Sequence, residues 1–109
     1  MTHVINKKWK KKGKDLVGER VNIGRSSLYG NPFITVEMQR FAGARGIVSE
    51  DPVRAYEDWL KGTRYTSVRQ AFRQAILNGL PSLKDKVLMC FCKPQPCHGD
   101  VLAKMADEL

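Results

Sequence analysis

The fold is decided by the stretch KVLMCFC at residues 86–92, which contains five consecutive apolar or thiol residues, VLMCF. The run is short, and Pro81 and Pro94 bound it on its two sides. Strands buried on both faces of a sheet have this continuous apolar character, whereas a helix needs a longer segment. The stretch therefore predicts the central strand of a small sheet.

Further elements are predicted outward from this strand. Residues 4–5 predict an edge strand and residues 17–23 a second strand, in which Val21 and Ile23 share one face. Helices are expected where caps and apolar spacing agree: 35–42, Asp51-Pro52 to Gly62, Thr66 or Ser67 to Gly79, and 98–109. The elements predict one compact α/β domain over residues 1–109, with a sheet of about three strands packed by three to four helices.

The composition is that of an ordinary globular domain, with 109 residues, 42% apolar and 28% charged. No apolar run approaches the roughly 20 residues of a membrane span, so no membrane partner is expected. The first six residues are too short for a secretory signal before the lysines begin. The three cysteines all lie between positions 90 and 97, which indicates a reduced thiol cluster rather than a disulfide framework. We expect a cytoplasmic protein.

The net charge of +8 is concentrated near the N-terminus, where residues 7–14 hold six lysines and no acid. Such a run attracts nucleic-acid phosphates, and an aromatic ring within it can stack on a base. The alternative is a solvated basic loop that keeps the protein soluble. The candidate nucleic-acid contacts are Lys7, Lys8, Trp9, Lys10, Lys11, Lys12 and Lys14.

A second informative stretch, CFCKPQPCHGD at residues 90–100, continues from the predicted central strand. Open α/β folds bind ligands at the carboxyl ends of their strands, beside the N-termini of helices. A thiol in such a place, next to an imidazole, is suited to act as a nucleophile or a ligand. The candidate catalytic residues are Cys97, His98 and Asp100, with Cys92 as a ligand-binding residue.

Two alternatives apply to the same stretch. Zinc ligation would use Cys92, Cys97 and His98, but zinc ribbons draw their ligands from two separated knuckles, and adjacent residues bind one ion poorly together. No cofactor is therefore predicted, and zinc stays the alternative. In the other interpretation Cys90 and Cys92 fill the core as small apolar side chains, and Asp100 caps the final helix.

The stretch IGRSSLYGNPF at residues 23–33 is the expected partner of the cysteine-rich stretch. Its arginine has a planar fork that suits phosphate or carboxylate, and serine hydroxyls and glycine amides can close around an anion. The asparagine offers both a donor and an acceptor to a base. A surface arginine, a turn-forming asparagine and a core phenylalanine are the alternative roles. The candidate ligand-binding residues are Gly24, Arg25, Ser26, Gly30 and Asn31.

In these motifs the chain resembles a family of phage and bacterial domains of unknown function. The matching residues are IGRS at 23–26, GNPF at 30–33, Tyr56 with Trp59-Leu60, and residues 90–102. The resemblance implies a compact α/β domain, a phage or bacterial origin and an association with nucleotide or nucleic-acid metabolism. The location would be the host cytoplasm if the chain is phage-encoded. The lysine run and residues 41–48 fall outside the shared pattern.

Two functions of different classes follow. The first is a site for a nucleotide or phosphorylated small molecule, in which Arg25 and the amides at His98 bind phosphate and Asn31 orients the base or sugar. Whether a reaction takes place there stays open. The second is a module that binds nucleic acid or a host protein through the lysine run, with a structural cysteine cluster.

Overall fold

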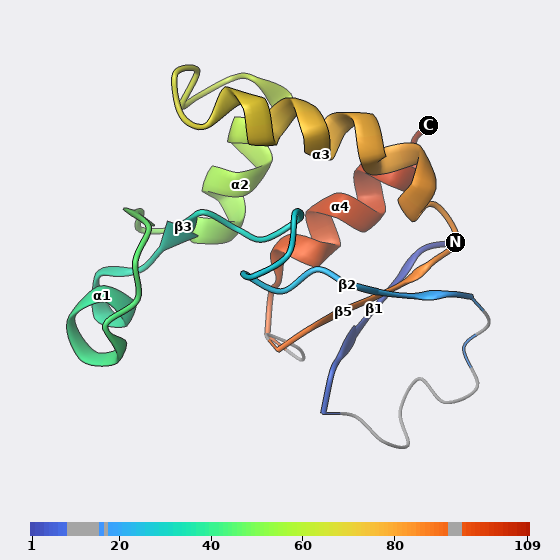
Figure 1. The fold of residues 1–109 in the computed structure, drawn as a ribbon, viewed down its shortest axis with the longest axis horizontal. Helices are drawn as coiled ribbons and strands as arrows, with labels where there is room; N and C mark the ends of the chain where they lie inside the picture. Colours follow the sequence, from blue (N-terminus) through green and yellow to red (C-terminus); the bar gives the residue numbers. More distant parts are fainter. Residues whose placement is uncertain (9–15, 17, 92–94) are drawn as a thin grey trace.

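The main sheet has three parallel strands, β1 (His3–Asn6), β5 (Val87–Cys90) and β2 (Arg20–Asn22), in the order β1-β5-β2 (Figure 1). The computed structural model describes residues 1–8, 16, 18–91 and 95–109. β5 is central, as predicted, and its Val87 and Leu88 side chains are fully buried. Val4 and Val21 both stand in register with Leu88, one on each side. The three strands therefore end at the same edge of the sheet.

Three helices form the rest of the core beside the main sheet. α4 (His98–Asp107) packs directly on β1 and β5, and α2 (Pro52–Lys61) and α3 (Gln70–Leu83) pack against α4 (Figure 1). The core is built largely from their facing side chains, with Trp59, Ile76 and Leu102 each at most 1% exposed. The predicted α/β class, with about three strands and three to four helices, is confirmed.

The N-cap and the closing glycine predicted for α2 are both present. Asp51 accepts a hydrogen bond from the Arg54 amide at 3.1 Å, and Gly62 ends α2 in the left-handed conformation at a φ of 77°. Thr35 caps α1 (Val36–Ala42) in the same way, through the amide of Met38. α1 has no buried residue and lies at the far end of the molecule from the main sheet (Figure 1).

The predicted bounds of α3 are wrong at both ends. The helix begins at Gln70 rather than after Thr66 or Ser67, and it continues through Gly79 and Pro81. Its last turn is kept because Leu80 and Leu83 are buried, and burying a leucine stabilises the fold by about 2 kcal/mol. Phe72, in the first turn of the helix, is 56% exposed.

Two further predictions need correction. The second strand is only Arg20–Asn22, shorter than residues 17–23, although the next amide still bonds to Met89. A second, two-stranded parallel sheet of β3 (Phe33–Ile34) and β4 (Ile47–Val48) was not predicted, because two-residue strands have no readable alternation.

In the part of the chain that the structure describes, no helix has the length and apolar character that crossing a membrane requires.

Candidate functional site

Residues 23–33 form a tightly folded segment that leaves the carboxyl end of β2. The Gly24 carbonyl accepts hydrogen bonds from both the amide and the hydroxyl of Ser27, at 2.9 and 2.6 Å, and the Ser27 carbonyl accepts from the Gly30 amide at 3.0 Å. A Cβ on Gly30 would lie 2.5 Å from the Arg25 carbonyl oxygen. Glycine is needed at position 30 because the backbone passes so close to itself.

Arg25 holds the two ends of this segment together. Its Nη1 donates to the carbonyl of Asn31 and, at 2.8 Å, to the carbonyl of Phe33. Sequence reasoning assigned the guanidinium to a ligand, and that stays a prediction. The contacts show in addition that Arg25 shapes the loop that would surround such a ligand.

The side chain of Asn31 ties the segment to α2. It is 6% exposed, its Nδ2 donates to the Pro52 carbonyl at 3.0 Å, and its Oδ1 accepts from the Phe33 amide at 2.9 Å. Phe33 is fully buried, with its ring centroid 4.7 Å from that of Tyr65 and 6.1 Å from that of Trp59. The Gly-Asn-Pro-Phe motif thus anchors the loop, and the role of Asn31 in orienting a base stays a prediction.

The Cys-His-Gly-Asp motif forms the first turn of α4. Cys97 is the N-cap, its Sγ accepts from the Gly99 amide at 3.3 Å, and the Asp100 carboxylate accepts from the Cys97 amide at 3.1 Å. This is a capping box, with cysteine in the place of serine or threonine. A Cβ on Gly99 would lie 2.6 Å from Ile23 Cδ1 and 2.9 Å from Val4 Cγ1. The motif therefore lets the helix start pack closely on the sheet.

His98 joins the two predicted stretches. Its side chain is almost wholly buried, and Nε2 lies 2.7 Å from the carbonyl oxygen of Ile23. Since a carbonyl only accepts, Nε2 carries the proton, and Nδ1 faces the Cys97 Sγ at 3.7 Å. Burial lowers the pKa of His98 from its ordinary value, although the bond to Ile23 opposes the shift. The ring is therefore neutral near pH 7.

The buried neutral His98 predicts that stability depends on pH. Below about pH 6.5 an unfolded histidine takes up a proton that the folded ring resists, so the free energy of unfolding should fall as the pH is lowered. Urea unfolding at pH 7.5, 6.5 and 5.5 measures this slope. We expect His98→Gln to be less stable at pH 7.5 but to lose most of the slope, whereas the control His3→Gln keeps it. An unchanged slope in His98→Gln would contradict the assignment.

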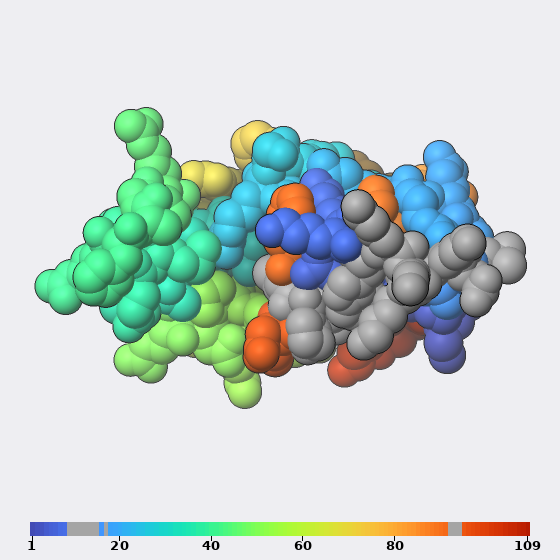
Figure 2. Space-filling model, turned by 90° about the horizontal axis from the view of Figure 1, so that it is seen from below, coloured from blue at the N-terminus to red at the C-terminus, as the bar shows by residue number. Residues whose placement is uncertain are grey.

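A cavity of about 380 Å³ lies at the carboxyl edge of the main sheet. The Lys7 amide bonds to the Cys90 carbonyl, so the ends of β1 and β5 lie side by side there, and Figure 2 looks onto this face. His98 brings the start of α4 to the same place. The lining residues are Lys7, Gly24, Arg25, Ser26, Cys90, Phe91 and His98.

Two lysines lie close to an exposed aromatic ring at this edge. Phe91 is 59% exposed, and the Nζ atoms of Lys7 and Lys8 lie 4.9 and 6.0 Å from the centre of its ring. A Cβ on Gly24 would lie 3.4 Å from the Lys7 ammonium, which is thus close both to Phe91 and to the start of the loop. The lining residues that the structure describes carry positive charge, and none of them is a carboxylate.

Sequence reasoning found part of this lining and missed another part. Gly24, Arg25, Ser26 and His98 were predicted and meet here, and Lys7 was predicted as a nucleic-acid contact. Phe91 was assigned to the buried strand, yet it follows the last residue of β5. The sequence carries no signal for this, because the unbroken apolar run does not show at which residue the strand ends. The predicted site residues that lie outside the described part of the chain are Trp9, Lys10, Lys11, Lys12, Lys14 and Cys92.

The two described cysteines are buried in the core. Their Sγ atoms lie 2.8 Å apart, and Cys90 and Cys97 are 1% and 0% exposed. Within the described part of the chain, no three His, Cys, Asp or Glu side chains are grouped as metal ligands. Cys92, which the zinc alternative needs, is not among those residues.

The fold and the cavity define a small parallel α/β domain with a basic cavity at the carboxyl edge of its sheet. The chain belongs to the family described as a domain of unknown function (DUF4326), whose model matches residues 5–108. No curated protein and no solved structure matches the chain.

Proposed function

We propose that this domain binds a nucleotide, or a similar phosphate-bearing ligand with a planar ring, in the cavity at the carboxyl edge of the main sheet. The observation that carries the proposal is the pairing of the Lys7 ammonium with the exposed Phe91 ring in a cavity whose described lining residues include no carboxylate. Ammonium groups bind phosphate, and an exposed phenylalanine stacks on a base.

The position of the cavity supports the same ligand class. In open α/β sheets ligands bind outside the carboxyl ends of the strands, where loops and helix N-termini meet. Here three parallel strands end together, and the loop after β2 closes one side. Arg25 places its positive charge in the wall while it holds that loop in shape. The positive wall would therefore offset part of the cost of taking a negatively charged ligand out of water, and a neutral or cationic ligand would not gain this attraction.

The contacts support binding rather than a catalytic role for the Cys-His-Gly-Asp motif. The Cys97 thiol is fully buried and accepts from an amide of the helix, and the Asp100 carboxylate completes the capping box. His98 holds the Ile23 carbonyl through the proton on Nε2. In this proposal His98 lines the cavity, and Cys97 and Asp100 cap the helix that carries it.

Calorimetric titration of the full chain with thymidine 5′-monophosphate and with thymidine tests the proposal. We expect binding to need the phosphate, because Lys7 and Arg25 supply the favourable charge. Lys7→Gln should weaken nucleotide binding about tenfold, and Phe91→Ala by a similar factor, since each removes about 1–2 kcal/mol.

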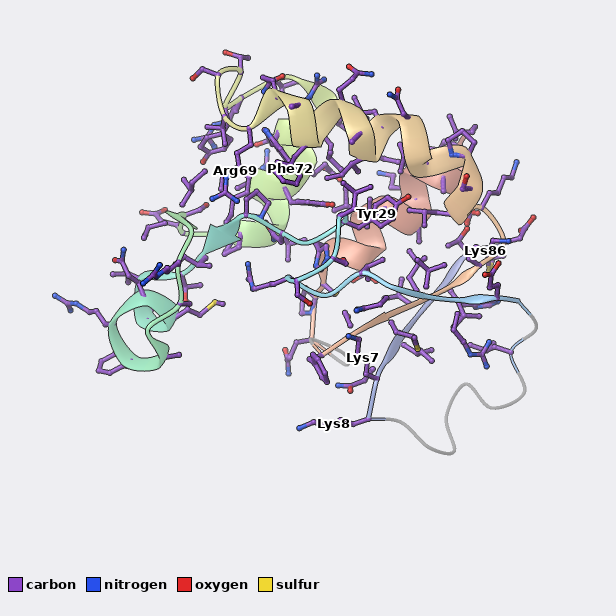
Figure 3. All side chains as sticks on the ribbon, in the orientation of Figure 1. Lys7, Lys8, Tyr29, Arg69, Phe72 and Lys86 are labelled. Atoms are coloured by element: carbon purple, nitrogen blue, oxygen red, sulfur yellow. The ribbon has the colours of Figure 1, made fainter. Side chains whose placement is uncertain are left out.

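The matched control is Lys86→Gln. Lys86 directly precedes β5 at the amino end of the sheet, opposite the cavity, and carries the same charge (Figure 3). Its replacement should leave the affinity within about twofold. The proposal fails if thymidine binds as well as its phosphate, or if Lys7→Gln and Lys86→Gln have equal effects.

A further inference from the structure

A second cavity, of about 270 Å³, is lined by the same loop of residues 24–32 and by parts of α2 and α3. Its wall brings together side chains from separate parts of the chain, because the loop, the residues before β4 and the start of α3 meet there. The residues that matter for its chemistry are Arg25, Ser26, Leu28, Arg45, Arg69 and Phe72.

The charge of this cavity is positive and unbalanced. Among the residues that the structure describes, three arginines line it and no carboxylate does. Arg45 and Arg69 are exposed, and within the described residues neither forms an ion pair. Arg69 is also the N-cap of α3, whose first turn contains no acidic residue. A cation at the positive end of a helix dipole is unfavourable, so an anion bound here would stabilise the arrangement.

The cavity also offers exposed apolar surface. Phe72 is 56% exposed and Leu28 43% exposed, although both are large apolar side chains. Figure 3 shows Phe72 and Arg69 near one another at the N-terminal end of α3. A planar ring beside an arginine suits a nucleobase that carries a phosphate. The second cavity thus repeats the chemistry of Lys7 and Phe91 with different residues.

The two cavities share part of their walls. Arg25 and Ser26 line both of them, so the same loop residues face two ligand spaces. Pockets for small ligands usually enclose about 300–1,000 Å³. At 270 and 380 Å³ each cavity is at or near the lower limit of that range. The volume of the two cavities taken together lies well inside the range.

From these contacts we infer that the two cavities form one binding site for two nucleotide units joined by a phosphodiester. The inference rests on the proposed function, which assigns the first unit to the cavity of Lys7 and Phe91. The second unit lies between Phe72 and the arginines Arg45 and Arg69. The linking phosphate lies near Arg25 and Ser26. A free dinucleotide and a segment of a single strand share this chemistry.

The test compares thymidine 5′-monophosphate, the dinucleotide pTpT and a six-residue oligothymidylate by calorimetry on the full chain. We expect pTpT to bind about tenfold or more tightly than the mononucleotide, since it adds charged contacts in the second cavity. The double variant Arg45→Gln/Arg69→Gln should lose that gain and still bind the mononucleotide normally, which also shows that it is folded. Arg40→Gln, an exposed arginine that lines neither cavity, is the matched control.

The outcomes separate the two claims. Equal affinities for the mononucleotide and pTpT, or a pTpT affinity that the double variant leaves unchanged, would overturn the inference while the proposed function stands. Binding of pTpT that depends on Arg45 and Arg69 but not on Lys7 would support the second cavity and overturn the first. No binding of any probe would overturn both. If the inference holds, a hexamer that binds much more tightly than pTpT identifies a single strand as the ligand, and equal affinities identify a free dinucleotide.

Discussion

Replacing Trp59 with alanine is expected to lower the free energy of unfolding by about 4 kcal/mol, a large part of the stability of a small domain. Trp59 is 1% exposed and packs against Phe33 and Tyr56, at ring-centroid distances of 6.1 and 5.8 Å. Its Nε1 donates to the Val68 carbonyl at 2.7 Å and so holds the chain just before α3. The alanine variant loses this packing and leaves the Val68 carbonyl without that donor.

Urea unfolding followed by circular dichroism measures the loss. Phe41→Ala is the matched aromatic control, because Phe41 is 83% exposed, and its replacement should change the stability by less than about 0.5 kcal/mol. Trp59→Phe should recover part of the loss through packing alone. A loss below about 1 kcal/mol in Trp59→Ala would show that the core does not depend on this ring.

Gly30→Ala is expected to destabilise the domain by about 2–3 kcal/mol and to weaken binding at the proposed site. The added Cβ would lie 2.5 Å from the carbonyl oxygen of Arg25 and 2.8 Å from its Cα. Both are backbone atoms, so the clash cannot be relieved by a rotamer change. The loop must open, and Arg25 would then lose its hold on the Asn31 and Phe33 carbonyls.

The same substitution in the same loop provides the control. A Cβ on Gly24 would meet the Asn22 Oδ1 at 3.1 Å and the Lys7 Nζ at 3.4 Å, and both are ends of side chains that can move. Gly24→Ala should therefore cost less than about 1 kcal/mol. Thermal unfolding of the two variants compares them directly. Equal losses of stability would show that the close approach of the Arg25 backbone is not the reason why position 30 requires glycine.

The central strand and α2 were predictable because local signals were enough. The apolar run at Val87 and Leu88 and the capping pair Asp51-Pro52 are each read from adjacent residues. The small β3–β4 sheet was not, since its two-residue strands are joined only by backbone hydrogen bonds between distant positions. The extension of α3 past Pro81 depends on the burial of Leu80 and Leu83, which is a tertiary effect that overrides local preference.

The site was predictable as two stretches that meet, and the bond between His98 and the Ile23 carbonyl brings them together. The inward contacts of Arg25 and Asn31 could not be read from the sequence, because their partners are carbonyl groups that any residue carries. Phe91 was missed for a related reason: an apolar run does not show at which residue the strand ends and the surface begins.

The strand order has a consequence for synthesis of the chain. β5 pairs with both β1 and β2, yet it follows both of them in the sequence. His3, for example, cannot pair until Val87 has been synthesised. A growing chain therefore exposes β1 and β2 to solvent without their shared partner, and such non-local pairing is slow. Until residues 87–90 are made, these strands keep open edges, which is the condition in which aggregation competes with folding.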